Sequence, residues 1–158
     1  MKHVVQLGAE GNGAATAYTM LKNGVGHLTI IDIDAKRSAG LSARFGLTFG
    51  KSRVAISGDL ADSLASADGL IYAMPTGMRS QPGIAVPVHR IKGSLGGVDV
   101  VYFPLHTELL RAAITAGCRT LDGSGMAVHQ ATEVFRLFSR LNADPERMHH
   151  HFLSQVSP

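Results

Sequence analysis

The sequence predicts an α/β domain built on a doubly wound parallel sheet with the strand order 3-2-1-4-5-6. Short apolar runs alternate along the chain with longer segments of helical periodicity, the pattern of parallel strands joined by crossover helices. A glycine cluster at 8–13 separates the first apolar run from the first helical segment, where such folds place a ligand-binding loop. The 158 residues fit a single domain, 1–158.

Six segments are expected to be strands because they are short, apolar and bounded by turn-forming residues. They span residues 3–7, 27–32, 53–57, 69–73, 98–103 and 119–123. Asp99 is expected to hold the start of the fifth strand. Right-handed crossovers place the carboxyl ends of all strands along one edge. The order reverses between the first and fourth strands, so loops 8–13 and 74–78 should open onto one crevice.

Six further segments are expected to be helices, at residues 13–24, 35–46, 59–68, 106–117, 124–141 and 144–153. Gly24 and Gly46 are the expected stops of the first two. Asp59 is the expected N-cap of the third, and Asp144 caps the last with Pro145 in its first position.

The helix expected over 124–141 carries one apolar face. Its members step by four, three, four and three residues: Ala127, Ala131, Val134, Phe138 and Leu141. Asp122 is expected to cap this helix.

Composition excludes several classes of protein. The net charge is +3 without a Lys/Arg run, so we expect neither a nucleic-acid nor a membrane surface. The single cysteine, Cys118, excludes an internal disulfide and is consistent with a reducing cytoplasm. No apolar run approaches the ~18 residues that a membrane span needs. We expect a cytoplasmic protein.

The stretch "QLGAEGNG", residues 6–13, resembles the dinucleotide-binding pattern Gly-x-Gly-x-x-Gly with one substitution. Gly8 fits the first glycine and Gly13 the third, whereas Glu10 stands at the second. The first glycine permits a sharp turn, the second lets the backbone approach a pyrophosphate, and the third allows close packing of helix and strand. Cofactor contacts are expected from the loop and the helix amides: Gly8, Ala9, Gly11, Asn12 and Gly13.

Glu10 is expected to weaken dinucleotide binding. Its Cβ occupies space, and its carboxylate would repel a pyrophosphate by roughly 1–3 kcal/mol if it pointed at the phosphates. Pointed toward solvent, it would cost less. Taken alone, the loop leaves two interpretations open: a dinucleotide site, or a glycine-rich turn that binds nothing.

Asp32 ends the second strand 24 residues after Gly8, close to the usual ~20, and Ile33 follows it. A carboxylate there accepts hydrogen bonds from a ribose diol and repels a 2′-phosphate, so NAD is favoured over NADP. Lys36 and Arg37 on the following helix are basic and would partly offset this preference.

Three later segments resemble the NAD(P)-binding domain of the shikimate/quinate dehydrogenase family. They are "ADGLIYAMPTGM" (67–78), "DVVYFPLHTELLRAA" (99–113) and "CRTLDGSGMAVHQATEVFRLF" (118–138). The matched positions are Ala73, Pro75, Gly77 and Met78, then Asp99, Tyr102, Pro104, Thr107, Leu109 and Leu110, then Gly123, Met126, Gln130 and Phe135. Tyr72 and Met74 stand where the family has Asn and Thr.

The resemblance implies a Rossmann-type domain with roles for particular residues. The loop after the fourth strand would line the nicotinamide ribose through Met74, Pro75, Thr76 and Gly77. Tyr102, Gly123 and Met126 would lie near the nicotinamide. Tyr102 and Gln130 would reach a shikimate- or quinate-like substrate. Asp32 stands where the NADP-using members have an Asn-Arg-Thr triplet, and in this it resembles the NAD-using quinate/shikimate branch of the family.

The resemblance also implies a second domain. In the family, an N-terminal substrate domain carries a catalytic Lys–Asp pair, and the general acid or base must lie within hydrogen-bond reach of the hydroxyl. We expect this chain to be the dinucleotide-binding half, truncated or separately encoded and inactive alone. We assign no catalytic residue.

A non-catalytic module is the alternative. Its dinucleotide loop would be disabled by Glu10, and it would self-associate or hold a partner through the exposed interdomain face, with Met78, Val86 and Val88 contributing apolar surface. No metal site is expected. The three consecutive histidines at 149–151 do not share one face of a helix, so they are interpreted as part of the polar surface of the last helix. His106 and His129 are expected to be structural or surface residues.

Overall fold

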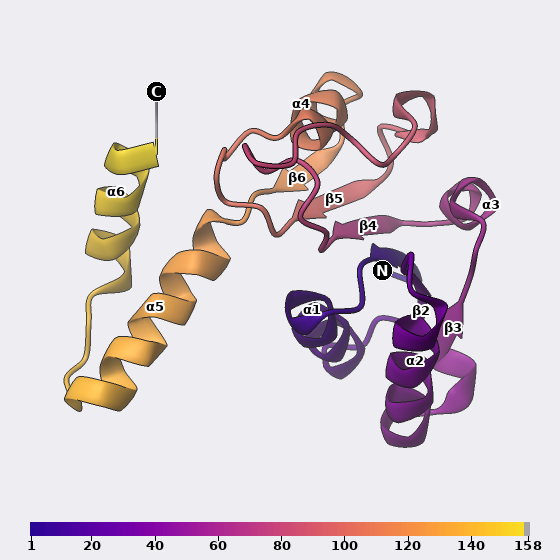
Figure 1. The fold of residues 1–158 in the computed structure, drawn as a ribbon, viewed down its shortest axis with the longest axis horizontal. Helices are drawn as coiled ribbons and strands as arrows, with labels where there is room; N and C mark the ends of the chain where they lie inside the picture. The colour runs from indigo at the N-terminus through magenta and orange to yellow at the C-terminus, as the bar shows by residue number, and fades with distance from the viewer. Residues whose placement is uncertain (157–158) are drawn as a thin grey trace.

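The structure, a computed structural model that describes residues 1–156, contains a six-stranded sheet with helices on both faces (Figure 1). The strand order is β3-β2-β1-β4-β5-β6 with every neighbouring pair parallel, so the predicted fold class is confirmed. The strands are β1 (His3–Leu7), β2 (His27–Ile31), β3 (Val54–Ile56), β4 (Gly69–Tyr72), β5 (Gly96–Asp99) and β6 (Arg119–Leu121).

Six α-helices connect and follow the strands. They are α1 (Gly11–Lys22), α2 (Ala35–Phe49), α3 (Leu60–Ala65), α4 (Glu108–Thr115), α5 (Ser124–Ser139) and α6 (Pro145–Val156). Two short 3-10 turns, η1 (Lys51–Arg53) and η2 (Val88–Arg90), complete the connections. None of the described helices is long and apolar enough to cross a membrane.

Alternation along the strands divides the core between the two faces of the sheet. Val4 of β1 packs in the cluster beneath α1 and α2, whereas its neighbour Val5 packs in the cluster beneath α3 and α4. In β4, Ile71 joins the first cluster and Tyr72 the second. Both faces of the strands are therefore buried, as continuous apolar runs predict for a parallel sheet.

The order in which strands are added to the sheet reverses at β1, which pairs with β2 on one side and with β4 on the other. At its carboxyl end, Leu7 lies level with Ile31 and Tyr72. The Gly8 amide still donates to Ile31 O at 2.8 Å, and Ala73 N donates to Leu7 O at 2.8 Å. The glycine loop therefore leaves the sheet between the ends of two neighbouring strands, at the predicted crevice.

The predicted fifth strand, 98–103, is wrong in its bounds. Asp99 ends β5 instead of starting a strand, because its carboxylate accepts from Val101 N at 2.9 Å and turns the chain out of the sheet. The same carboxylate accepts from Thr107 Oγ1 at 2.6 Å, and Thr107 caps α4, which begins at Glu108 and not at the predicted residue 106. Apolar residues 100–103 thus line the crevice instead of continuing the strand.

The predicted end of the second helix was also wrong. Gly46 lies buried inside α2, which continues to Phe49 and ends at Gly50 with φ +102°. The first helix begins two residues earlier than predicted, but its predicted stop is confirmed: the helix ends at Lys22, and Gly24 adopts φ +87° directly after the cap residue Asn23. The predicted caps Asp59 and Asp144 are confirmed by hydrogen bonds to amides of their helices.

The last two helices, α5 and α6, form a hairpin that stands beside the sheet (Figure 1). Asp122 accepts from Ser124 N at 2.8 Å at the start of α5, as predicted for a capping residue. The helix ends at Ser139 and not at the predicted 141, because Arg140 adopts the left-handed conformation. Beyond its first turns, α5 exposes several large apolar side chains: Val134, Phe135, Leu137 and Phe138. The predicted apolar contribution of Val86 was wrong, because that residue is buried.

Candidate functional site at the carboxyl edge of the sheet

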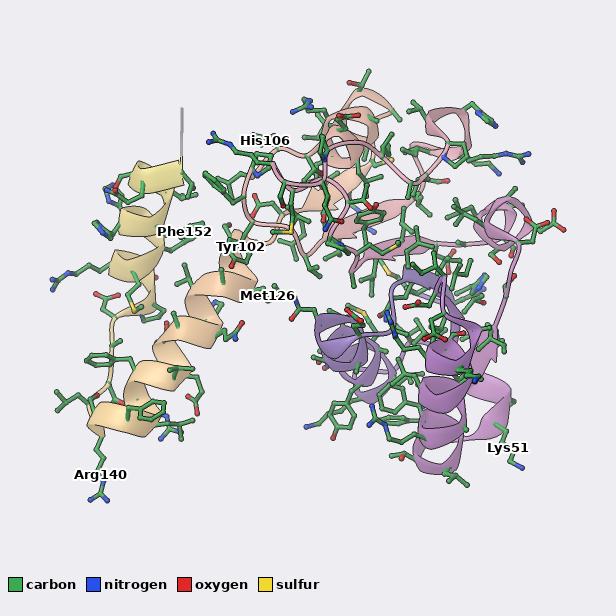
Figure 2. The ribbon with its side chains drawn as sticks, in the orientation of Figure 1. Lys51, Tyr102, His106, Met126, Arg140 and Phe152 are labelled. Atoms are coloured by element: carbon green, nitrogen blue, oxygen red, sulfur yellow. The ribbon has the colours of Figure 1, made fainter. Side chains whose placement is uncertain are left out.

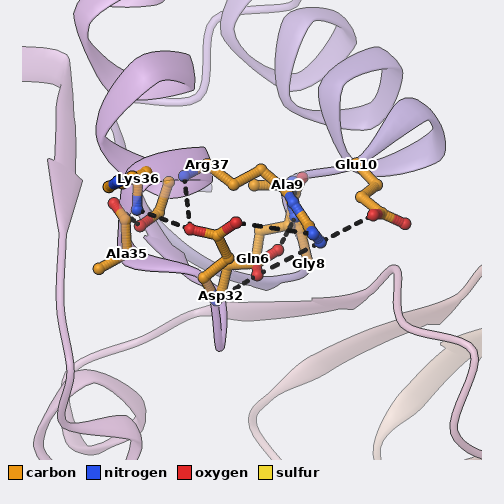
Figure 3. A network of polar contacts seen from close by, with 10 residues as sticks. Gln6, Gly8, Ala9, Glu10, Asp32, Ala35, Lys36 and Arg37 are labelled. Carbon is orange, nitrogen blue, oxygen red and sulfur yellow. Dashed lines mark hydrogen bonds and ion pairs between the residues drawn. The ribbon is translucent and has the colours of Figure 1, made fainter.

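Gln6 holds the glycine loop in shape. Its side chain is fully buried, and Nε2 donates to Gly8 O at 2.8 Å and to Gly13 O at 2.7 Å (Figure 3). Its Oε1 accepts from Thr16 Oγ1 at 2.9 Å. The amide thereby joins the start of the loop to the first turn of α1, a role that the sequence analysis did not assign.

The glycines of the loop differ in what surrounds them. A Cβ on Gly8, which has φ +97°, would overlap the Ala73 carbonyl, and a Cβ on Gly13 would overlap the Gly8 carbonyl. Close backbone packing therefore requires both glycines. A Cβ on Gly11 would meet nothing within 4 Å. The protein leaves space over Gly11, beside first-turn amides of α1 that have no intrahelical acceptor.

Glu10 occupies the N-cap position of α1 without making a side-chain capping bond. Its side chain is 68% exposed, and Oε1 lies 2.9 Å from Nη1 of Arg37 on α2 (Figure 3). The carboxylate is thus drawn toward α2 and partly neutralised. The ion pair joins the glycine loop to the helix that follows β2.

Asp32 connects the end of β2 with the glycine loop. Its side chain is 4% exposed, Oδ2 accepts from Ala9 N at 2.7 Å, and Oδ1 accepts from Asp34 N at 2.8 Å. Arg37 Nη1 lies 3.5 Å from Oδ1. Ile33 follows it and is 90% exposed, which provides an apolar surface beside the carboxylate.

Two cavities flank the loop. The smaller, of about 310 Å³, is bounded by Gly8, Asp32, Ile33, Arg37, Thr76 and Gln81 among others. The larger, of about 690 Å³, extends from Gly11 and Asn12 past residues 100–103 to Phe152 and Val156 of α6. Glu10, Ala73, Met74 and Pro75 line both cavities. The two cavities therefore adjoin each other at the carboxyl edge of the sheet, beside the glycine loop and the loop after β4.

The loop after β4 is braced from below by β5 and α4. Gly77 adopts φ +105°, and a Cβ there would touch the Thr107 side chain. Thr107 in turn donates to the fully buried Asp99. Burial raises the pKa of the Asp99 carboxyl, while its two hydrogen bonds oppose that shift. Asp99 thus supports the loop from inside and does not reach the cavities.

Tyr102 joins the larger cavity to a third cavity of about 550 Å³ between α5 and α6. Gln130 lines that third cavity too, so Tyr102 and Gln130 border the same cavity. The Tyr102 ring packs edge-on against Phe152 of α6, with centroids 6.2 Å apart (Figure 2). Met126 projects from the first turn of α5 on the side away from α6 (Figure 2).

The chain is similar to curated dehydrogenases along almost its whole length. It is 46% identical over 150 residues to a shikimate dehydrogenase (NADP+) of Streptomyces avermitilis, covering 94% of this chain and 52% of that protein. It is 42% identical over 153 residues to a quinate/shikimate dehydrogenase (NAD+) of Corynebacterium glutamicum, covering 96% and 54%. No protein-family profile matches the chain.

A solved structure extends the similarity to the fold. The quinate dehydrogenase from Corynebacterium glutamicum in complex with NAD superposes with a TM-score of 0.90 at 42% identity, covering 97% of this chain and 55% of that one. This chain is a homologue of the NAD(P)-binding half of the shikimate/quinate dehydrogenases. It spans about half the length of the curated relatives it matches.

Two residues that depart from the pattern of the dehydrogenase family have different surroundings. Tyr72 is 1% exposed and belongs to the core beneath α3 and α4, so its ring does not enter the crevice. Met74 lines both cavities. Gly123, which the family pattern shares, starts α5 where a Cβ would overlap the Val100 and Val101 carbonyls, so packing alone already requires glycine there.

The remaining candidate side chains lie apart from one another. His106 and His129 are exposed, and His149 contacts Ser124 Oγ at 3.0 Å. Within residues 1–156, no three His, Cys, Asp or Glu side chains form a metal-binding group. Cys118 donates to Lys92 O, and burial raises the pKa of its thiol.

Proposed function

We propose that residues 1–158 form the NAD-binding half of a shikimate/quinate dehydrogenase-like oxidoreductase. The observation that supports this most directly is the open space over Gly11 at the first turn of α1, beside the larger cavity. A Cβ at Gly11 would meet nothing within 4 Å, so a pyrophosphate has room to approach the free amides of this turn.

The residues of this chain would bind and orient the two reactants. The α1 amides would hold the pyrophosphate, and Asp32 with Ile33 would receive the adenosine ribose. Met74, Pro75, Thr76 and Gly77 would line the nicotinamide ribose, with Gly123 and Met126 near the ring. Tyr102 and Gln130 would contact the substrate. The cofactor supplies a hydride acceptor for the substrate hydroxyl.

Proton transfer is assigned to another part of the enzyme. The hydroxyl needs a general acid or base within hydrogen-bond reach, and no residue of this chain is assigned that role. The family's substrate domain would supply it. The purified chain is therefore expected to show no shikimate- or quinate-dependent reduction of NAD.

NAD is the proposed cofactor, in preference to NADP. Asp32 lies at the end of β2 with Asp34 close by, and a 2′-phosphate would add negative charge beside both carboxylates. Among the relatives, the quinate/shikimate dehydrogenase of Corynebacterium glutamicum is named for NAD+ and the shikimate dehydrogenase of Streptomyces avermitilis for NADP+. The preference therefore has to be measured on this chain.

A calorimetric titration of the chain with NAD and with NADP at low salt tests the proposal, beside a Glu10→Gly variant. We expect sub-millimolar binding of NAD, weaker binding of NADP, and tighter binding of both by the variant. Because Glu10 forms an ion pair with Arg37, its carboxylate should repel the phosphates less strongly than an unpaired carboxylate would. Binding of neither cofactor by the native chain would overturn the proposal.

A second candidate is supported by the exposed apolar face of α5. Phe138 is 88% exposed, an unusual position for phenylalanine, and its neighbours on α5 are also exposed. A non-catalytic module that self-associates or holds a partner through this face would need no cofactor. A native chain that fails to bind NAD while Glu10→Gly binds it would favour this module, with a disabled loop.

A further inference from the structure

Arg37 is surrounded by carboxylates beside the smaller cavity. Its Nη1 lies 2.9 Å from Glu10 Oε1 and 3.5 Å from Asp32 Oδ1, and its Nη2 lies 3.8 Å from Asp34 Oδ2 (Figure 3). One guanidinium is therefore shared among three acids that come from the loop, the end of β2 and the cap of α2. An anion that approaches Arg37 meets a local excess of negative charge.

We propose that Glu10 is a specificity-determining residue that tethers Arg37 and thereby disfavours NADP relative to NAD. This inference rests on the proposed dinucleotide function. The 2′-phosphate of NADP would lie next to the ribose hydroxyls that Asp32 receives. Arg37 is the basic side chain nearest that carboxylate in the structure, and a guanidinium is well suited to phosphate when its donors are free.

Glu10 has no other structural task in the loop. It makes no capping bond with its side chain, it is largely exposed, and its only ion pair among the described residues is with Arg37. Replacing the carboxylate with an amide should therefore leave the fold intact. The substitution changes the charge on Arg37's principal partner and little else.

The pyrophosphate effect of Glu10 can be separated from the effect on Arg37. NAD and NADP share the pyrophosphate, so repulsion or crowding there changes the affinities for both cofactors by the same factor. The ratio of the two dissociation constants isolates what happens at the 2′ position. A tether predicts a change in this ratio that depends on Arg37, whereas direct repulsion of the 2′-phosphate by Glu10 does not depend on Arg37.

The experiment measures dissociation constants for NAD and NADP with the native chain, Glu10→Gln, Arg37→Gln and the double variant. Glu133→Gln is the matched control, because Glu133 forms a similar ion pair with Arg136 on α5, away from both cavities that flank the loop. We expect Glu10→Gln to shift the ratio toward NADP by about tenfold, the scale of one unit charge several ångströms away. The shift should disappear in the Arg37→Gln background and be absent in the control.

Each other result decides a different point. An unchanged ratio in Glu10→Gln, with NAD still bound, overturns the inference and leaves the proposed function standing. An equal shift in the Arg37→Gln background means direct repulsion and also overturns the tether. A failure of every variant, and of the native chain, to bind either cofactor overturns the proposed function and the inference together. Thermal melts of each variant verify that it is folded.

Discussion

Gly8 and Gly11 lie three residues apart in one loop and are glycines for different reasons. Gly8 adopts φ +97° beneath the Ala73 carbonyl, so the fold requires it. Gly11 has open space above it, so close packing does not require a glycine there. The sequence pattern treats the loop as one ligand-binding unit, whereas the structure separates positions that hold the loop from positions that face the cavity.

Alanine at these two positions should separate stability from binding. Gly8→Ala is expected to lower the free energy of unfolding by about 2–5 kcal/mol, because it combines a strained φ with overlap of the Ala73 carbonyl. Gly11→Ala should change it by less than about 1 kcal/mol, since alanine favours the helix, yet weaken NAD binding. Urea unfolding and calorimetric titration give the two quantities. Loss of stability in Gly11→Ala, or unchanged NAD affinity, would contradict this division.

At the scale of elements, side chains at strand ends determine where the strands stop. Asp99 ends β5 and supports the cap of α4 through Thr107. At the opposite edge of the sheet, Asp68 precedes β4 and its Oδ2 accepts from Lys2 N at 2.7 Å and from His3 N at 2.9 Å. These two backbone hydrogen bonds lower the pKa of the Asp68 carboxyl. Asp68 thereby fixes the start of β1 beside β4.

Asp68→Asn should change how stability depends on pH. Because the pKa is lower in the folded than in the unfolded state, the carboxylate's contribution is present above the unfolded-state pKa and is lost as pH falls through the folded-state pKa. The native chain should therefore have the higher Tm at pH 7, and the difference should shrink toward pH 3. Thermal melts across this range measure it. A Tm difference that stays constant between pH 7 and pH 3 would show that the charge is not responsible.

At the scale of the whole molecule, two apolar clusters hold helices α1 to α4 against the sheet, whereas the hairpin of α5 and α6 leaves apolar side chains exposed. The buried residues of α5, Ser124 and Val128, lie in its first part, whereas its later apolar residues are exposed. Of the apolar face that the sequence predicted for this helix, Val134 and Phe138 are exposed and Leu141 lies beyond the end of the helix. The sequence did not indicate that these residues would lack a covering element within the described residues.

The exposed face of α5 should make the isolated chain self-associate at high concentration and bind an apolar dye. Phe138→Ser is expected to reduce both effects, because Phe138 is 88% exposed among other apolar residues. Leu47→Ser is the matched control, since Leu47 is 82% exposed but lies on α2. Sedimentation velocity over a concentration series measures the association. A native chain that stays monomeric and binds no dye would contradict this expectation.

The sequence by itself determined the strand order, the position of the crevice and the composition of the glycine loop. These follow from local information: apolar periodicity, turn residues and the fixed handedness of crossovers. It also showed that Glu10 departs from the glycine pattern, and it predicted that Asp32 favours NAD over NADP. The end of β5, which the buried Asp99 sets through Val101 and Thr107, and the hydrogen bonds of the buried Gln6 to the glycine loop lay beyond such reasoning, because they depend on which polar side chains the fold buries.

Only the tertiary structure decided where Glu10 points. The sequence left its carboxylate either toward the phosphates or toward solvent, because nothing in the loop alone fixes an exposed side chain. Arg37 lies 27 positions later in the chain and becomes its partner only when β2 pairs with β1 and brings the start of α2 beside the loop. An ion pair between residues so far apart depends on the register of the sheet, which local sequence patterns do not contain.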